Sequence, residues 1–182
     1  MASERKRKVV LLRGINLANR RRVSMAALRE LLERLGYDDV RTHLQSGNVV
    51  LSSTLPPTKL ERALERELEL ELGFDVAVIV RTRAELAKIV ERNPLGKVAT
   101  NPSHYLVSFL RAAPSTEVVR ELADVDVAPE QFVLAGRELY AWHPNGVQRS
   151  RLAKEISERR LGVTATARNW NTVTKLLELT RE

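Results

Sequence analysis

The first structural unit begins with the apolar run Val9-Val10-Leu11-Leu12, which continues into the loop Arg13-Gly14-Ile15-Asn16-Leu17-Ala18-Asn19-Arg20-Arg21-Arg22. Four consecutive aliphatic residues predict a buried β-strand. The residues after the loop predict a helix, because Ser24 is a good N-cap and Gly36 is a typical stop signal. The apolar face of this helix consists of Leu28, Leu31, Leu32 and Leu35. The basic loop therefore connects a strand to a helix.

The rest of the first half adds a hairpin, a helix and a further strand. The predicted strands are Val40–Gln45, Asn48–Leu51 and Asp75–Val80, with a turn at Ser46-Gly47-Asn48 between the first two. Alternating residues on both sides of a glycine-containing turn are typical of a β-hairpin. Thr58 and Glu61 have the spacing of a capping box, which predicts the start of the helix between the hairpin and the last strand. The predicted order is βαββαβ.

The second half repeats this order after a helix at Thr82–Asn93 capped by Thr82 and Glu85. Its predicted elements are strand Tyr105–Leu110, helix Ser115–Ala123, strands Gln131–Leu134 and Glu138–Trp142, helix Ser150–Leu161, strand Val163–Ala167 and a final helix. The halves also match without gaps at a constant offset of 87 residues. The matched pairs are Arg81 with Arg168, Leu86 with Val173, Lys88 with Lys175, Ile89 with Leu176 and Val90 with Leu177. Gly47 and Gly136 fall in equivalent hairpins.

These patterns predict an α+β fold of duplicated ferredoxin-like βαββαβ units, each followed by an extra helix. The first unit would span residues 1–93 and the second residues 94–182. We expect the two units to pack as one body, with the Pro-containing stretch 94–102 as a connection within it. Chance agreement between two amphipathic helices is the alternative explanation of the offset match.

Composition excludes several kinds of chemistry. The 182 residues are 43% hydrophobic and contain no cysteine, which excludes disulfides, thiolate zinc sites and cysteine nucleophiles. The charged N-terminus has no apolar signal-peptide segment, and no apolar run has the length of a membrane span. We therefore expect a cytoplasmic protein without a membrane partner.

The positive charge is concentrated at one end of the chain. Residues 1–22 contain eight of the 30 Lys and Arg residues and one of the 23 acidic residues, so they carry the whole net charge of +7. Such an asymmetry attracts anions to one part of the surface. An anionic ligand should therefore meet the N-terminal end of the fold first.

A first candidate site follows from the predicted topology. In a sheet of strand order 4-1-3-2, the end of strand 1 lies beside the turn that begins strand 3. The ligand-binding candidates brought together there are Arg13, Gly14, Asn16, Arg20, Arg21, Arg22, Gln45, Ser46, Gly47 and Asn48. Guanidinium groups, a helix N-terminus and close backbone approach at glycine are what a phosphate requires. The glycines do not form a P-loop or a dinucleotide-binding motif, so no cofactor is predicted.

Structural roles compete with this interpretation. Gly14 and Gly47 suit turns that need positive φ, and Ser24 suits a helix N-cap. The Arg20–Arg22 triplet also suits a solvated loop. Ser46 lacks the sequence context of a nucleophile elbow.

A second candidate cluster lies in the second half, where two strand ends point the same way. Its residues are Arg149, Ser150, Arg168, Asn169, Trp170 and Asn171. The structural alternative is that Ser150 and Asn169 cap helices while Trp170 covers the edge of the core. The three histidines, His43, His104 and His143, are far apart in sequence, so no metal site is predicted.

The chain resembles the bacterial "domain of unknown function 1697" family over nearly its whole length. The motifs that carry the resemblance are Leu11-Leu12-Arg13-Gly14-Ile15-Asn16, Met25 with the Leu-rich helix, Val40-Arg41-Thr42, Gln45-Ser46-Gly47-Asn48-Val49-Val50, Arg149-Ser150-Arg151-Leu152 and Thr166-Ala167-Arg168-Asn169-Trp170-Asn171-Thr172-Val173. Ala18-Asn19 and His43 replace the Gly-Gly pair and the aromatic residue of the family pattern. The resemblance implies a duplicated α+β fold and no established activity.

Three functions remain open, and no catalytic residue is identified. The first is a binding module for an anionic ligand, either a nucleic-acid phosphate backbone or a phosphorylated small molecule. Base stacking is not expected, because the central strands are aliphatic and aromatics are 4% of the chain. The second is an enzyme that acts on a small phosphorylated or carboxylated metabolite, with Arg13 and Arg168 as anion clamps. The third is a structural or interaction protein without a ligand.

Overall fold

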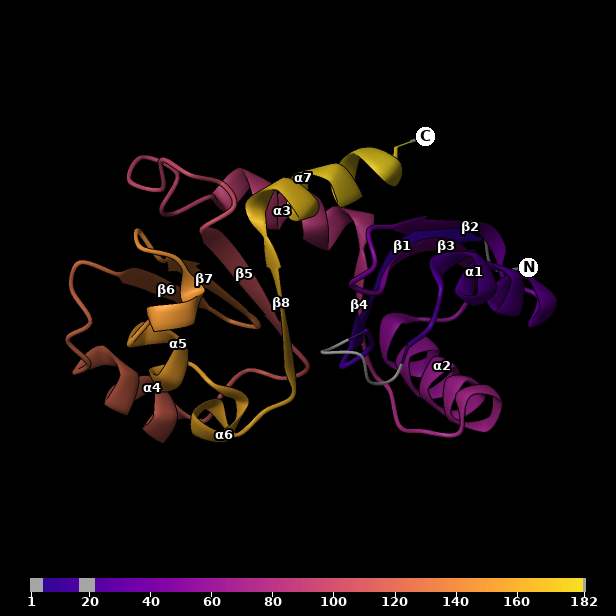
Figure 1. Cartoon of the computed structure of the whole chain (residues 1–182), viewed down its shortest axis with the longest axis horizontal. Helices are drawn as coiled ribbons and strands as arrows, with labels where there is room; N and C mark the ends of the chain where they lie inside the picture. The colour runs from indigo at the N-terminus through magenta and orange to yellow at the C-terminus, as the bar shows by residue number, and fades with distance from the viewer. Residues whose placement is uncertain (1–4, 17–21, 182) are drawn as a thin grey trace. The chain divides into compact units, whose positions relative to one another are not determined.

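A computed structural model describes residues 5–16 and 22–181 of the chain (Figure 1). The fold is mixed α+β and contains two four-stranded antiparallel sheets. The chain divides into two compact units. One comprises the described residues up to Lys88 together with those from Lys175, and the other comprises Ile89–Thr174.

The first unit contains one complete sheet and the helices that cover it. Its elements are β1 (Lys6–Arg13), α1 (Met25–Arg34), β2 (Asp38–His43), β3 (Asn48–Ser53), α2 (Pro57–Leu72) and β4 (Ala77–Thr82), followed by the start of α3 (Arg83–Arg92). The strand order is β2-β3-β1-β4, which is the 4-1-3-2 arrangement that the sequence predicts. β1 is a central strand, with Val9 opposite Val50 on one side and Arg81 on the other.

One face of this sheet packs against α1 and α2. Val10 and Leu12 of β1 join the same apolar cluster as Leu28 of α1 and Leu64 of α2, and all four are almost completely buried. These residues alternate along the strand and repeat at helical spacing along the helices, as amphipathic elements around one core require. Val9 and Leu11, on the opposite face of β1, are also fully buried. Both faces of the central strand are therefore apolar and covered.

The second unit has the same sheet order. Its elements are β5 (Tyr105–Leu110), α4 (Thr116–Ala123), β6 (Gln131–Ala135), β7 (Glu138–Trp142), the 3₁₀ turn η1 (Val147–Arg149), α5 (Leu152–Glu155), α6 (Glu158–Leu161) and β8 (Ala165–Asn169), followed by α7 (Trp170–Leu179). The order β6-β7-β5-β8 again places the first strand between the third and the fourth. Leu110, Leu139 and Ala141 form its core with Leu122 of α4 and Leu152 of α5.

Two sequence predictions about helices are wrong. The Thr58–Glu61 capping box does not form, because the N-cap of α2 is Pro56, two residues before Thr58, and the helix has no side-chain cap. Glu61 instead accepts a hydrogen bond of 2.8 Å from the Val80 backbone N–H, and Glu65 accepts one of 2.9 Å from Val78. These carboxylates occupy donors of edge strand β4 that would otherwise be open to another strand.

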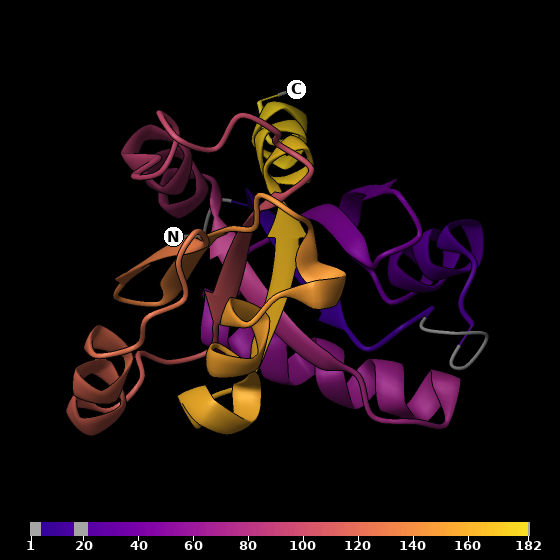
Figure 2. The same cartoon turned by 60° about the vertical axis from the view of Figure 1, so that its left-hand side comes forward.

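The helix predicted at Ser150–Leu161 is also wrong, since the segment folds as α5 and α6. Figure 2 shows the two as separate short orange helices. Ser157 interrupts the helix with an extended backbone, at φ −63° and ψ 154°. Serine favours a cap position over a helix interior. Glu158, which follows it, accepts a hydrogen bond from the Ala165 N–H of edge strand β8.

The helices α3 and α7 keep the 87-residue offset at both ends, since their bounds are Arg83–Arg92 and Trp170–Leu179. Their caps correspond as well. Thr82 Oγ1 accepts the Glu85 N–H at 3.2 Å, and Asn169 Oδ1 accepts the Thr172 N–H at 3.0 Å. Glu85 completes a capping box by accepting the Thr82 N–H at 2.8 Å.

Candidate functional site

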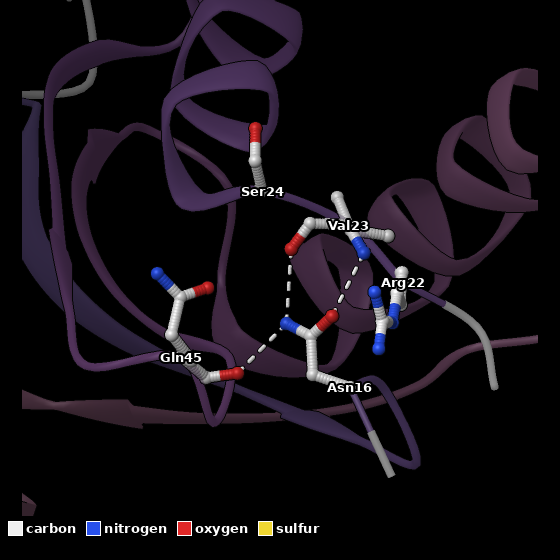
Figure 3. Close-up of a pocket in the computed structure, with 5 residues that line it drawn as sticks. All are labelled: Asn16, Arg22, Val23, Ser24 and Gln45. Atoms are coloured by element: carbon white, nitrogen blue, oxygen red, sulfur yellow. Dashed lines mark hydrogen bonds between the residues drawn. The ribbon is translucent and has the colours of Figure 1, made fainter. Parts of the chain in front are cut away.

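Asn16 joins the loop after β1 to two other segments (Figure 3). Its Nδ2 donates to the carbonyls of Val23 at 2.9 Å and Gln45 at 2.8 Å, and its Oδ1 accepts from the Val23 N–H at 2.8 Å. Asn16 has φ 55°, a left-handed conformation that asparagine tolerates better than most residues. The amide of Asn16 is therefore committed to holding the loop, the start of α1 and the β2–β3 turn together.

Gly47 is enclosed by the strand end that precedes this loop. It has φ 76°, and a Cβ atom at this position would lie 2.8 Å from Leu12 Cβ and 2.9 Å from Ile15 Cδ1. Its carbonyl accepts the Leu12 N–H at 2.8 Å. The turn can approach β1 this closely only because residue 47 lacks a side chain.

Asn48 stabilises the same turn from within. Its buried Nδ2 donates to the His43 carbonyl and to Ser46 Oγ, both at 2.9 Å. The structure thus brings the two predicted motifs together, as the strand order requires. Asn16, Gly47 and Asn48 all make contacts that fix the fold.

A pocket of about 390 Å³ opens at this junction. It is lined by Asn16, Arg22, Val23, Ser24 and Gln45. In Figure 3 the guanidinium of Arg22 and the side chain of Gln45 lie on either side of Asn16. Ser24 Oγ caps α1 by accepting the Ala27 N–H at 3.0 Å, as expected for an N-cap. The pocket therefore combines an exposed cation with the first turn of a helix.

The other predicted residues of this site have separate positions. Arg13 is exposed at the end of β1, and Gly14 has φ 79° in the turn that follows. Ser46 is exposed and accepts from Asn48. Arg20 and Arg21 lie outside the described residues.

The second predicted cluster consists mainly of residues with partners inside the fold. Arg168 is 8% exposed, and its Nη1 donates to Thr166 Oγ1 at 2.7 Å and to the Ala167 carbonyl at 2.8 Å. Burial lowers the pKa of its guanidinium to about 10. The buried guanidinium of Arg168 is therefore bonded to residues of its own strand, β8, and these contacts give it a structural role.

The remaining members of this cluster also have structural contacts. Trp170 stacks on Tyr105 with ring centroids 4.8 Å apart, and Asn171 Nδ2 donates to Ser103 Oγ at 3.3 Å. Ser150 Oγ accepts the Ala153 N–H at 2.7 Å, which caps the turn before α5. Arg149 is exposed at the end of η1. Ser150 therefore caps a helix start, and Trp170 packs against the ring of Tyr105.

A buried polar triad in the second unit was missed by the sequence analysis. His143 Nδ1 lies 2.8 Å from Glu130 Oε1 and 2.9 Å from Ser150 Oγ. Glu130 Oε2 also accepts the backbone N–H groups of Arg151 and Leu152, at 3.0 and 2.9 Å. Glu130 precedes a strand and is 13 residues from His143, so no local spacing connects them.

The pKa of Glu130 reflects this environment. Burial tends to raise it, but hydrogen bonds from the Leu152 N–H, Ser150 and His143 outweigh that effect and lower the pKa from its ordinary value. Both Ser150 and Glu130 meet the same imidazole nitrogen. A nucleophile-base-acid relay needs contacts on the two different ring nitrogens. This triad is therefore an anchor for the segment that begins α5.

Two further properties concern the whole described chain. Within residues 5–16 and 22–181, no group of three or more His, Asp and Glu side chains is placed to hold a metal ion. In the same ranges, no helix has both the length and the apolar character that crossing a bilayer requires.

The fold and pocket define a protein of two α+β units, each with a four-stranded antiparallel sheet, and a small polar pocket in the first. This chain belongs to the family described as "Protein of unknown function (DUF1697)", which it matches over residues 5–140. The predicted family is thus confirmed.

The solved structures include a similar protein, the conserved bacterial protein SP0830 from Streptococcus pneumoniae. It has a TM-score of 0.78 and 19% sequence identity, and the match covers 97% of this chain and 99% of that one. This similarity shows that the two chains share a fold. No curated protein matches this chain.

Proposed function

We propose that this protein is a binding module for an anionic ligand, and that the ligand's phosphate occupies the pocket beside Asn16. The observation that carries the proposal is the position of Arg22 at a pocket of about 390 Å³ that also contains the start of α1. A guanidinium and the N–H groups of a first helical turn both attract phosphate oxygens.

The composition of the pocket supports binding over acid–base catalysis. Among the described residues that line it, none carries a carboxylate or an imidazole. Gln45 and Asn16 offer amides, which exchange no protons near neutral pH. The three hydrogen bonds of Asn16 keep the walls in place before a ligand arrives. Such preorganisation lowers the entropic cost of binding.

The charge distribution supports the same proposal at longer range. Residues 1–22 carry the net positive charge of the chain; of these residues Arg22 lines the pocket and Arg13 ends β1 on the same side, while Arg5 to Lys8 lie at the other end of the strand. This field would raise the local concentration of a phosphorylated metabolite or of a nucleic-acid backbone. The two ligand classes differ in one measurable property, since a nucleic acid that contacts several phosphates binds with a steep dependence on salt.

We also infer that the sequence consists of two duplicated ferredoxin-like repeats, residues 1–93 and 94–182, whose bounds differ from those of the two compact units because α3 and α7 end the repeats. The supporting observations are the shared strand order and the 87-residue offset that relates α3 to α7. The lack of cysteine supports a cytoplasmic location, where thiols are kept reduced and disulfides are rare.

The proposal is tested by comparing Arg22→Ala with Arg29→Ala. Both changes remove one exposed arginine, but Arg29 lies on α1 in an ion pair of 3.9 Å with Glu33. Binding of adenosine monophosphate is measured by calorimetry, and binding of a labelled single-stranded oligonucleotide by fluorescence anisotropy over a salt series. We expect Arg22→Ala to weaken binding about tenfold or more, as loss of a charge-assisted hydrogen bond does.

The control variant should bind as the unmodified protein does. Equal losses in the two variants would assign the binding to general surface charge and refute the pocket. Binding of the mononucleotide without a steep salt dependence would identify a small phosphorylated ligand. Binding of the oligonucleotide alone, with a steep salt slope, would identify a nucleic-acid backbone.

A further inference from the structure

The two sheets in the described part of the chain have four edge strands, which differ in how they are protected. The edges are β2 and β4 in the first sheet and β6 and β8 in the second. The outer backbone groups of an edge strand can pair with a strand of another chain, and natural proteins block them with charges, bulges or covering groups. An edge without such protection is available to a partner.

Three of these four edges are protected. In β4, Glu61 and Glu65 accept backbone N–H groups of the strand at 2.8 and 2.9 Å. In β8, Glu158 accepts the Ala165 N–H. β2 has three Asp or Arg residues among its six, and its register with β3 shifts within the range Asp38–Arg41. A carboxylate, a charge or a bulge therefore opposes the pairing of each of these edges with another strand.

The fourth edge, β6, is uncharged and regular. Its sequence is Gln131-Phe132-Val133-Leu134-Ala135, and all five residues pair with β7 without a register shift. Figure 1 shows β6 at the outer edge of its sheet, beyond β7. Phe132 and Leu134 pack against the core cluster that includes Leu122 of α4, which holds the strand on that face. Such a strand pairs readily with another one.

The outward backbone groups of β6 belong to Phe132 and Leu134. The Arg137 carbonyl accepts the Leu110 N–H of β5 at 2.9 Å, so the odd-numbered residues here point their backbone groups towards β5 and the even-numbered residues of β7 towards β6. The β6 residues opposite those even-numbered ones are 131, 133 and 135. Across the described chain, no hydrogen bond from outside the sheet reaches residues 132 and 134. Two N–H and two carbonyl groups are thus available.

We propose that β6 pairs with β6 of a second copy of this chain, antiparallel and about a two-fold axis at Val133. This register sets Phe132 of one copy opposite Leu134 of the other, so that the available N–H and carbonyl groups meet in four hydrogen bonds. It sets Gln131 opposite Ala135, so no like charges face each other across the axis.

The self-complementarity of the strand favours a second copy over an unrelated extended peptide. The same five residues supply uncharged neighbours on both sides of the axis. The pairing also closes at two copies, since Glu158 engages the other edge of the same sheet. A two-fold interface of this kind does not propagate into a filament. The proposal is independent of the pocket beside Asn16, because that pocket belongs to the first unit and β6 to the second.

The test uses the absence of cysteine from the chain. Val133→Cys and Gln131→Cys each give the full-length protein a single thiol on β6. At the proposed axis the two copies of residue 133 form a non-hydrogen-bonded pair, with Cα atoms about 4.5 Å apart, which a disulfide can span. The two copies of residue 131 are four strand positions apart, or roughly 13 Å, which a disulfide cannot span.

Under mild oxidation, we expect Val133→Cys to form a covalent dimer about tenfold or more faster than Gln131→Cys, as followed by non-reducing gel electrophoresis. Thr42→Cys, which places a thiol on edge strand β2, is the matched control and should crosslink as slowly as Gln131→Cys. Equal rates in the three variants would assign crosslinking to random collision and overturn the proposal.

Sedimentation of the unmodified protein tests the association without a crosslink. We expect a dimer at about 100 µM, since a small interface gives a weak complex. A monomer at that concentration would overturn the pairing of two copies.

A pair of charged variants tests the axis if Val133→Cys does not fold. Val133→Lys and Val133→Asp each set like charges opposite each other, so each variant alone should sediment as a monomer. An equimolar mixture should regain the dimer, because lysine then faces aspartate. A dimer that persists in either variant alone, or a mixture that stays monomeric, would overturn the proposed axis.

Discussion

The hairpin turns of the two units each accept a hydrogen bond from the first strand of their sheet, through Gly47 in one and through the residue after Gly136 in the other, but their surroundings differ. In the first unit, the Gly47 carbonyl accepts the Leu12 N–H at 2.8 Å, and in the second the Arg137 carbonyl accepts the Leu110 N–H at 2.9 Å. A Cβ atom on Gly47 would collide with Leu12 and Ile15, whereas nothing lies within 4 Å of one on Gly136. Leu12 and Ile15 therefore enclose the first hairpin turn, and nothing encloses Gly136 in the same way.

This difference separates residues that build the pocket from residues that face a ligand. Asn16 and Asn48 resemble ligand-binding groups in sequence, but the amide of Asn16 donates to the Val23 carbonyl and that of Asn48 to the His43 carbonyl. Arg22 is the charged residue that lines the pocket. The motif residues Asn16 and Asn48 thus shape the site, and Arg22, which belongs to no distinctive motif, supplies its charge.

Gly47→Ala should have the largest effect on stability. It combines strain at φ 76° with contacts below 3 Å, so we expect a loss of about 3 kcal/mol in the free energy of unfolding. Gly136→Ala has the strain alone, at φ 65°, and should cost about 1 kcal/mol. Urea unfolding of both variants measures the difference. Equal losses would show that Leu12 and Ile15 do not enclose Gly47.

Asn16→Ala should have the next largest effect. The change removes three hydrogen bonds and places alanine at φ 55°, for which we expect a loss of about 2 kcal/mol. The control is Asn171→Ala, which removes one exposed hydrogen bond of 3.3 Å and should cost less than about 0.5 kcal/mol. A small loss in Asn16→Ala would mean that the loop is held by other contacts.

The buried triad of the second unit provides a pH-dependent test. Hydrogen bonds lower the pKa of Glu130 in the folded protein, so its contribution to stability is complete above its ordinary pKa of 4.5 and is lost as the pH falls through the folded value. We expect Glu130→Gln to cost about 1.5 kcal/mol at neutral pH. The difference between the two proteins should shrink below pH 4.5, which unfolding curves at several pH values will show. A difference independent of pH would contradict the role of the carboxylate.

The caps of α3 and α7 should give the smallest effects, and nearly equal ones. Thr82→Ala and Asn169→Ala each remove the acceptor of one first-turn N–H, so each should cost about 1 kcal/mol. Thermal unfolding followed by circular dichroism measures both. A much larger loss in one variant would show that the corresponding caps no longer have equivalent roles.

Much of the fold was predictable because local patterns and topology agree. Apolar runs identified the strands, and the expected 4-1-3-2 order correctly placed the loop after β1 beside the turn before β3. The errors occurred where tertiary contacts override a local signal. Glu61 has capping-box spacing but serves the edge of β4, and Ser157 divides a segment of otherwise helical pattern.

The site was harder to predict than the fold. Sequence indicates which polar residues converge, but only coordinates show that Asn16 is saturated with backbone partners. Glu130 meets His143 through folding of distant segments. Lys8 belongs to a basic N-terminal run that is typical of a solvated strand end, yet it is 5% exposed and donates to the Ser53 carbonyl of a neighbouring strand.

The most direct test of the proposed function is a crystal structure of the protein grown with inorganic phosphate. We predict a phosphate in the pocket beside Asn16, within hydrogen-bond distance of the Arg22 guanidinium and the first turn of α1. The Asn16 side chain should keep its contacts with Val23 and Gln45. A pocket without phosphate, in a crystal that holds phosphate on other arginines, would contradict it.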